Sequence, residues 1–389
     1  MTKLATVFMI VLVDLIGFGI VLPLLPFYGT RFGASPLAIG LLYSVYSFAQ
    51  FIAAPLWGIW SDRVGRRPVM LLSMGAAVIA YLLFATAGSF GALFVSRLVA
   101  GVMGGNISAA QAYVADVTTE EERARGMGLI GAAFGIGFVL GPALAGVLML
   151  ERLPLPGLLA AHRLALPGLT AAALSFSSFL LILFRLPEPA KKTLTARSDR
   201  REIFTRRFWS GPLALFFAAA FLFSLGQSSL YGAFPLYCHS RIGMGPDGVG
   251  FLYVLMGVVT VIIQGGALRA LVRRFGERRL FLAGAILLTA GLMMIGLTAS
   301  ARFLAAMLVM MTAGVSLSVP VLNSLVTKRA GGAGYGASLG AAQSLAALGR
   351  TVGPAWGGLL FGISAASPFW ITAIVISATI WIGLRIQAD

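Results

Sequence analysis

Asp14 and Arg97 are ionisable residues that lie inside apolar segments, where a charge is costly. Asp14 stands about ten residues into the apolar run 5–28, roughly 15 Å deep at the 1.5 Å rise per residue of a helix. Arg97 lies within the apolar run 90–116. Burial disfavours the charged form of a carboxylic acid, whereas a nearby cation favours it. An acid paired with an arginine at similar depth is suited to exchange a proton near neutral pH; a permanent structural ion pair is the alternative.

A second group of charged residues follows the apolar run 37–60. It combines one acid with several arginines and with glycines that permit a tight turn. An acid at a helix end can pair with these arginines or with the N-terminus of another helix. Asp116 is a second acid at the end of an apolar run. The pattern favours a network of ion pairs over a simple row of positive anchors, at Gly58, Asp62, Arg63, Gly65, Arg66, Arg67 and Asp116.

The composition determines what kind of elements must position these residues. The 389 residues are 59% hydrophobic and 11% charged, and the mean hydropathy is +0.93. Soluble domains carry about 25% charged residues, so this chain is predicted to lie in a membrane. The net charge of +16 does not indicate nucleic-acid binding, because the basic residues form short bursts between apolar runs. One cysteine and two distant histidines predict no metal site, and no cofactor is expected.

Twelve apolar runs are long enough to cross a hydrocarbon core of roughly 30 Å as helices. The predicted fold class is therefore an all-α membrane protein with twelve transmembrane helices in two six-helix bundles. Most of the 29 Lys and Arg residues fall in segments that are cytoplasmic when both termini are inside. The predicted runs are 5–28, 37–60, 68–88, 90–116, 124–150, 165–186, 211–238, 247–270, 279–299, 301–327, 335–362 and 366–386. The glycine-rich stretch 331–336 is expected to be a loop.

Two features recur at nearly one offset and indicate an internal repeat. The charged segment Asp62–Arg67 returns 211 residues later as Arg273–Arg278, and Gly141-Pro142 returns 212 residues later as Gly353-Pro354. We therefore expect an N-terminal bundle over 1–186, a cytoplasmic linker over 187–210 and a C-terminal bundle over 211–389. Repeats of this kind are typical of secondary transporters, whose substrate site lies between the repeats near the midplane. In the second half, Arg273 occupies the position equivalent to Asp62. An acidic latch, in which an acid at a helix end pairs with neighbouring arginines, is therefore predicted in the first half alone.

Small residues and prolines inside the runs are predicted to let helices approach closely or bend. They are Gly101, Gly105, Gly137, Gly141, Pro142, Gly353 and Pro354. Polar residues inside the runs are candidates for binding a solute, although each serves equally well as a packing contact between helices. The candidates for the substrate cavity are Gln50, Asn106, Gln111, Gln227, Gln264, Asn323, Gln343 and Arg350.

Together these patterns resemble the major facilitator superfamily, and within it the twelve-helix drug:proton antiporters, especially the tetracycline-exporter-like branch. The resemblance implies a proton-coupled exporter that works by alternating access in a bacterial-type cytoplasmic membrane. It assigns proton coupling to Asp14 and Arg97 and gating to the Asp62–Arg67 loop. The pattern around Gly141-Pro142 is similar to the one associated with antiporters. The expected partners are a small amphipathic or drug-like solute, protons and the lipid bilayer, with a monomer as the assembly.

Two departures from the branch bear on the solute. Arg350 stands inside a helix where drug exporters more often have an apolar residue, and the acid that tetracycline exporters carry in helix 9 is absent from 279–299. Both argue against tetracycline itself, and one acid against two arginines favours an anionic or zwitterionic solute. An importer or a facilitator of a metabolite or lipid-like solute is the alternative, followed by a non-transporting receptor. An enzyme is not predicted, because no nucleophile, base and orienting group can be assembled.

Overall fold

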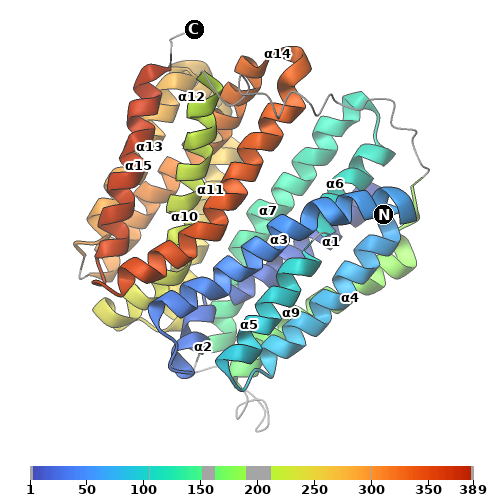
Figure 1. The fold of residues 1–389 in the computed structure, drawn as a ribbon, viewed down its shortest axis with the longest axis horizontal. Coiled ribbons are helices and arrows are strands. Elements are labelled where there is room, and N and C mark those ends of the chain that lie inside the picture. The colour runs from blue at the N-terminus through green and yellow to red at the C-terminus, as the bar shows by residue number, and fades with distance from the viewer. Residues whose placement is uncertain (1–2, 105, 151–162, 190–211, 299, 387–389) are drawn as a thin grey trace. The chain divides into compact units, whose positions relative to one another are not determined.

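The structure is a computed structural model that describes residues 3–104, 106–150, 163–189, 212–298 and 300–386 (Figure 1). Within these ranges the ordered elements are helices and there is no strand, which confirms the predicted all-α fold class. The first half of the chain forms α1 (Lys3–Val21), α2 (Leu25–Arg31), α3 (Pro36–Val64), α4 (Arg66–Ala85), α5 (Phe90–Met103), α6 (Asn106–Val117), α7 (Glu120–Met149), the short turn η1 (Arg163–Ala165) and α9 (Leu166–Arg185).

The described part of the second half of the chain is also helical. It forms α10 (Pro212–Ile242), α11 (Pro246–Val261), the π-helical segment η3 (Ile262–Ala267), α12 (Leu268–Phe275), α13 (Glu277–Ile295), α14 (Ala301–Phe361) and α15 (Ser367–Arg385). Among the described residues, eleven helical segments are long and apolar enough to cross a membrane. Large apolar side chains such as Leu56, Phe184 and Ile374 are exposed, as expected of helices that face lipid. The chain is a multi-pass membrane protein.

One predicted loop is wrong. The runs 301–327 and 335–362 both fall in α14, whose helical backbone continues through the glycine-rich stretch 331–336. Glycine disfavours a helix by about 1 kcal/mol per residue without preventing backbone hydrogen bonds, so neighbouring turns can carry the helix through such a stretch. The loop prediction relied on glycine content alone, which is a weak signal here.

Three predicted helices are interrupted. The run 5–28 is divided into α1 and α2 at Leu22–Leu24, where Pro23 withdraws a backbone donor and Pro26 occupies the first turn of α2. The run 90–116 is divided into α5, which ends at Met103, and α6, which begins at Asn106. At the break, the Gly104 carbonyl accepts a hydrogen bond from the Gln50 side chain. The run 247–270 contains the π-helical turns of η3, a form that is rare and often found at functional sites.

Contacts divide the chain into two units. The first comprises Met1–Ala34, Val45–Thr193 and Met244–Gly257, and the second comprises Ser35–Ser44, Leu194–Gly243 and Val258–Asp389. The start of α3 therefore packs with helices of the second unit, and most of α11 packs with helices of the first. The bundle boundaries expected from the sequence, on either side of 187–210, stay a prediction.

The glycines of the repeat bring equivalent helices together in each unit. In the first, a Cβ atom on Gly141 of α7 would lie 2.6 Å from the Gly19 Cα of α1, so these two backbones are in direct contact. In the second, a Cβ atom on Gly353 of α14 would lie 2.7 Å from the Leu225 carbonyl oxygen of α10. Two glycines that are 212 residues apart in the chain thus make the contact between α1 and α7 and the contact between α10 and α14. Small residues at these positions are a packing requirement.

Candidate functional site

The half-buried Asp14 of α1 lies near a buried tyrosine of α4. Tyr81 is 5% exposed and interacts electrostatically with the charges of both Asp14 and Arg97. Gly17, one helical turn after Asp14, faces this tyrosine, since a Cβ atom there would lie 3.5 Å from the Tyr81 hydroxyl. Three helices, α1, α4 and α5, therefore bring an acid, a phenol and a guanidinium into one cluster.

Arg97 of α5 is 3% exposed and is held against aromatic rings. Its guanidinium carbon lies 4.9 Å from the ring centre of Phe84 and 5.8 Å from that of Tyr81. Its Nε donates a 3.4 Å hydrogen bond to the Ser96 hydroxyl. The negative faces of aromatic rings stabilise a desolvated cation. Arg97 is therefore a fixed positive charge in the surroundings of Asp14.

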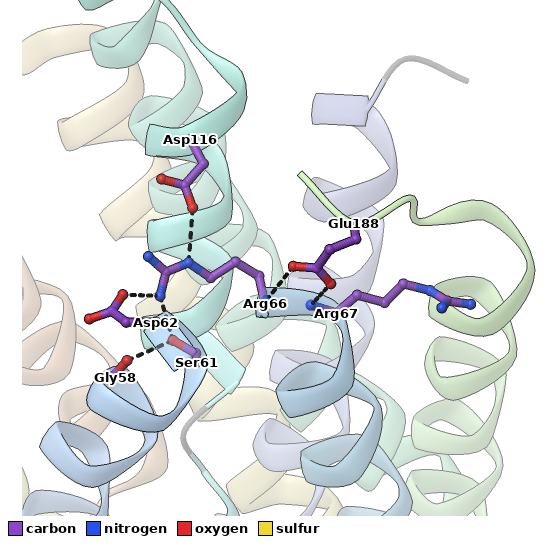
Figure 2. A network of polar contacts seen from close by, with 7 residues as sticks. All are labelled: Gly58, Ser61, Asp62, Arg66, Arg67, Asp116 and Glu188. Atoms are coloured by element: carbon purple, nitrogen blue, oxygen red, sulfur yellow. Dashed lines mark hydrogen bonds and ion pairs between the residues drawn. The ribbon is translucent and has the colours of Figure 1, made fainter. Parts of the chain in front are cut away.

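The second cluster is centred on the buried Arg66, the first residue of α4 (Figure 2). Its Nη1 lies 2.6 Å from Oδ1 of Asp62 at the end of α3, and its Nε lies 2.9 Å from Oδ2 of Asp116 near the end of α6. Nη1 also donates a hydrogen bond to the Ser61 hydroxyl, which in turn donates to the Gly58 carbonyl at 2.8 Å. The two carboxylates offset the burial of the guanidinium. The structure thus joins the ends of three helices through one arginine.

Sequence reasoning missed the acid that completes this cluster. The carboxylate of Glu188, just beyond the end of α9, accepts hydrogen bonds from the backbone N–H groups of Arg66 at 2.6 Å and Arg67 at 2.9 Å (Figure 2). The chain can turn into α4 here because Gly65 has a φ of +107°, a conformation that favours glycine. An acid at the start of a presumed linker carries no distinctive sequence signal, so Glu188 is visible in the tertiary contacts alone.

Neighbouring contacts fix Glu188 in place. The Tyr113 hydroxyl of α6 donates a 2.9 Å hydrogen bond to the Pro187 carbonyl. Arg67 Nη2 donates a 2.8 Å bond to the Leu183 carbonyl at the end of α9. The first two residues of the segment expected as a solvated linker are therefore part of the cluster. Of the other predicted gating residues, Arg63 is exposed and Gly58 has open space around its Cα.

The predicted packing residues make close helix contacts where the structure describes them. Gly101 of α5 approaches α3, since a Cβ atom there would lie 2.9 Å from the Tyr46 Cα. Gly137 and Pro142 of α7 lie against Leu15 and Gly19 of α1, as Gly141 does. Pro354 of α14 lies against Gly40 of α3 within the second unit. Gly105 lies outside the described residues.

The predicted polar candidates have different surroundings. Gln50 is a packing residue, because its Nε2 donates to the Gly104 carbonyl at 3.2 Å and lies 3.5 Å from the Tyr46 hydroxyl. Arg350 is exposed and interacts electrostatically with Tyr231, whose ring centre lies 6.0 Å from that of Tyr43. Gln227 and Asn323 are half-buried, Gln111, Gln264 and Gln343 are exposed, and the Asn106 side chain lies outside the description. A shared substrate cavity lined by these residues stays a prediction.

Comparison with known proteins agrees with this fold. Residues 7–354 match the family described as the Major Facilitator Superfamily. The chain is 30% identical over 353 residues to the tetracycline resistance protein, class E, of Escherichia coli, which covers 89% of this chain and 84% of that protein. It is 31% identical over 431 residues to the human major facilitator superfamily domain-containing protein 10, covering 97% of this chain and 90% of that protein.

A solved structure gives the same result. The crystal structure of the human organic anion transporter MFSD10 aligns with a TM-score of 0.68 at 28% identity, over 98% of each chain. The helical architecture and the family match define a multi-pass membrane transporter of small molecules. The chain belongs to the Major Facilitator Superfamily, and its relatives include tetracycline resistance proteins, as the sequence motifs predict. It is a transporter and not an enzyme.

Proposed function

We propose that this protein is a proton-coupled exporter of a small organic anion or zwitterion with amphipathic character. The observation that carries the proposal is the cluster of Asp14, Tyr81 and Arg97. Asp14 is the single acid deep inside a predicted span, and it shares Tyr81 with a buried arginine. A titratable carboxylate in such a place is a proton site by default, because a permanent charge there has no structural advantage over an apolar side chain.

The coupling follows from the chemistry of the cluster. The carboxylate of Asp14 binds a proton when the site opens to a compartment of low pH and releases it when the site opens to the other side. Arg97 cannot titrate in this range, so it acts as a constant charge that limits how tightly the proton is held. The cationic group of a zwitterionic solute and a proton would then compete for the carboxylate of Asp14, while the acidic group of the solute binds Arg97; this competition is the basis of antiport.

The class of solute follows from the buried and exposed cations. Arg97 is held by aromatic rings, and Arg350 is an exposed arginine in α14 beside Tyr231. Guanidinium groups bind carboxylates and phosphates in a bidentate geometry. A related human protein is described as an organic anion transporter, and other relatives are described as tetracycline and multidrug resistance proteins. The two arginines favour a solute that carries a negatively charged group, as zwitterions and anions both do.

The Arg66 cluster is the proposed gate. Its ion pairs join the ends of α3, α4 and α6, so these ends separate when the contacts of Asp62 and Asp116 with Arg66 break. Asp62 is 51% exposed, and its pair is the one that solvent can most easily replace. We further propose a bacterial-type cytoplasmic membrane as the location, both termini in the cytoplasm, and a monomer as the working unit.

The test is transport by the purified protein in proteoliposomes with an imposed pH gradient. Fluorescein, tetracycline and a zwitterionic amino acid serve as probes, and a trapped dye reports internal pH. We expect the zwitterionic probe to accumulate against its gradient while protons move the opposite way. Solute movement without any pH change would instead support the facilitator, and co-movement of solute and proton would support the importer. Absence of movement for every probe in protein that is folded would argue for the receptor.

A further inference from the structure

The first turn of α13 carries an ion pair with α14. Nζ of Lys328 lies 2.9 Å from Oε2 of Glu277, and the Ser324 hydroxyl donates a 2.8 Å hydrogen bond to Oε1 of the same carboxylate. The Glu277 side chain is 14% exposed and that of Lys328 is 57% exposed. A carboxylate so far removed from water depends on its partners. The sequence predicted no such latch in the second half, because Arg273 occupies the position there that is equivalent to Asp62.

The internal repeat makes Glu277 the counterpart of Arg66. Gly65 precedes α4 with a φ of +107°, and Gly276 precedes α13 with a φ of +78°. These two glycines are 211 residues apart, the offset of the repeated charged segment. The residue after each glycine begins its helix, so Arg66 and Glu277 occupy the same place in the two halves.

The partner of Glu277 is also the counterpart of the partner of Arg66. Lys328 follows Asp116 at an offset of 212 residues, the offset at which Gly-Pro recurs. Both pairs have an N···O distance of 2.9 Å. The two pairs are therefore built at equivalent positions with the charges exchanged.

The exchange extends to a third position. Asp62, which pairs with Arg66 one helical turn later, has Arg273 as its counterpart, one turn before Glu277. An acid, base, acid arrangement in the first half thus becomes a base, acid, base arrangement in the second. Coulomb attraction is unchanged when every sign is reversed. If the sign of the charge changed at only one of the three positions, like charges would meet. The charge changes at all three positions, so neighbouring positions still carry opposite charges.

The helix dipole explains why the first half needs an additional acid. The N-terminus of a helix carries a partial positive charge, which disfavours Arg66 at the start of α4 and favours Glu277 at the start of α13. In the first half, Glu188 supplies the negative charge at the backbone amides of Arg66 and Arg67. In the second half, Glu277 is itself the acid of the first turn. The two arrangements therefore satisfy the same electrostatic requirement by different residues.

We propose that Glu277, Ser324 and Lys328 form a second clasp, which ties the first turn of α13 to α14 by the same attraction as Arg66 and Asp116 with the charges exchanged. The clasp is a positioning device and depends on the pairing of opposite charges, not on lysine or glutamate as such. Lys328 supplies the charge from an exposed position, so its substitution leaves the fold intact.

Amide hydrogen exchange of the full-length protein in lipid nanodiscs tests the clasp. We expect Lys328→Met to raise exchange in the first turns of α13 by about tenfold, since the charge of Glu277 loses its partner. Lys328→Arg should retain protection, and Lys328→Glu should lose more than Lys328→Met because like charges then meet. Arg329→Gln, next to Lys328 and also exposed, is the matched control.

The double variant Glu277→Lys with Lys328→Glu decides whether charge pairing is the cause. It should recover protection relative to Glu277→Lys alone, though not fully, because a lysine opposes the dipole at the start of α13. Unchanged exchange in Lys328→Met, or no recovery in the double variant, would overturn the proposal. The experiment needs no transported solute, so its failure leaves the proposed function untouched.

Discussion

The carboxylate of Glu188 accepts a hydrogen bond of 2.6 Å from the backbone amide of Arg66, which closes the N-terminus of α4 with a residue from beyond the end of α9. The side chain of Arg66 meanwhile binds Asp62 and Asp116. One residue thus uses its backbone to hold the connector after α9 and its side chain to hold α3 and α6. This double use explains how a short charged segment can connect the ends of four helices.

The first prediction concerns Glu188. Glu188→Ala should lower the free energy of unfolding by about 1–2 kcal/mol, because two amides at the start of α4 lose their acceptor and the helix dipole loses its compensating charge. Glu188→Gln keeps one acceptor oxygen without the charge and should lose roughly half as much. Thermal unfolding of the purified protein in detergent measures both. Wild-type stability in Glu188→Ala would mean that the observed contacts contribute nothing.

The second prediction separates the two acids that bind Arg66. Asp62→Asn should change stability by less than about 1 kcal/mol, since the Asp62 side chain is 51% exposed. It should still slow turnover, because the gate loses one of its ion pairs. Asp116→Asn should cost more stability, because the Asp116 side chain is 15% exposed and its pairing offsets a buried guanidinium. Transport rate and unfolding temperature are compared for both variants. Equal effects of the two would contradict this assignment.

The third prediction concerns coupling at Asp14. Asp14→Asn preserves size and hydrogen bonding but cannot titrate, so it should abolish accumulation driven by a pH gradient and leave downhill exchange. Asp14→Glu should retain partial coupling with a shifted pH optimum. Uptake into proteoliposomes with and without the gradient is the measurement. Accumulation against the gradient at the wild-type rate in Asp14→Asn would place the proton pathway elsewhere.

The fourth prediction compares two glycines that the sequence cannot rank. Gly141→Ala should destabilise the protein by about 1–3 kcal/mol, because the added methyl group meets the backbone of Gly19 at 2.6 Å. Gly58→Ala should be neutral or stabilising by up to about 1 kcal/mol, because there is open space around Gly58 inside α3. Unfolding in detergent distinguishes them. The assignment of Gly141 to packing fails if both variants behave alike.

The fifth prediction tests the topology. A cysteine placed within 187–210 should resist an impermeant thiol reagent in intact cells, whereas a cysteine at Ala34 should react. The variants carry Cys238→Ala, and the native thiol is itself buried. Disruption of the cells should expose the first site and serves as the internal control. The opposite labelling pattern would reverse the proposed orientation.

The sequence by itself determined the class of protein and the position of most helices. Low charge content and long apolar runs permit few arrangements, because a bilayer requires helices whose backbone groups are bonded within the segment. The motifs around Asp62–Arg67 and Gly141-Pro142 determined the family. Glycine and proline were less informative, as the helix through 331–336 and the break at Gly104 demonstrate, since their effect depends on the contacts around them.

The tertiary structure alone decided which distant residues meet. Asp14 and Arg97 share Tyr81, a residue with no sequence signal of its own, and Glu188 reaches the start of α4 from a segment that reads as a linker. The ion pair of Glu277 with Lys328 was hidden because the repeat preserves the pairing while exchanging the signs. The physical reason is common to all three. Local sequence sets the helical period, whereas the packing of helices far apart in the chain sets which side chains come within reach of one another.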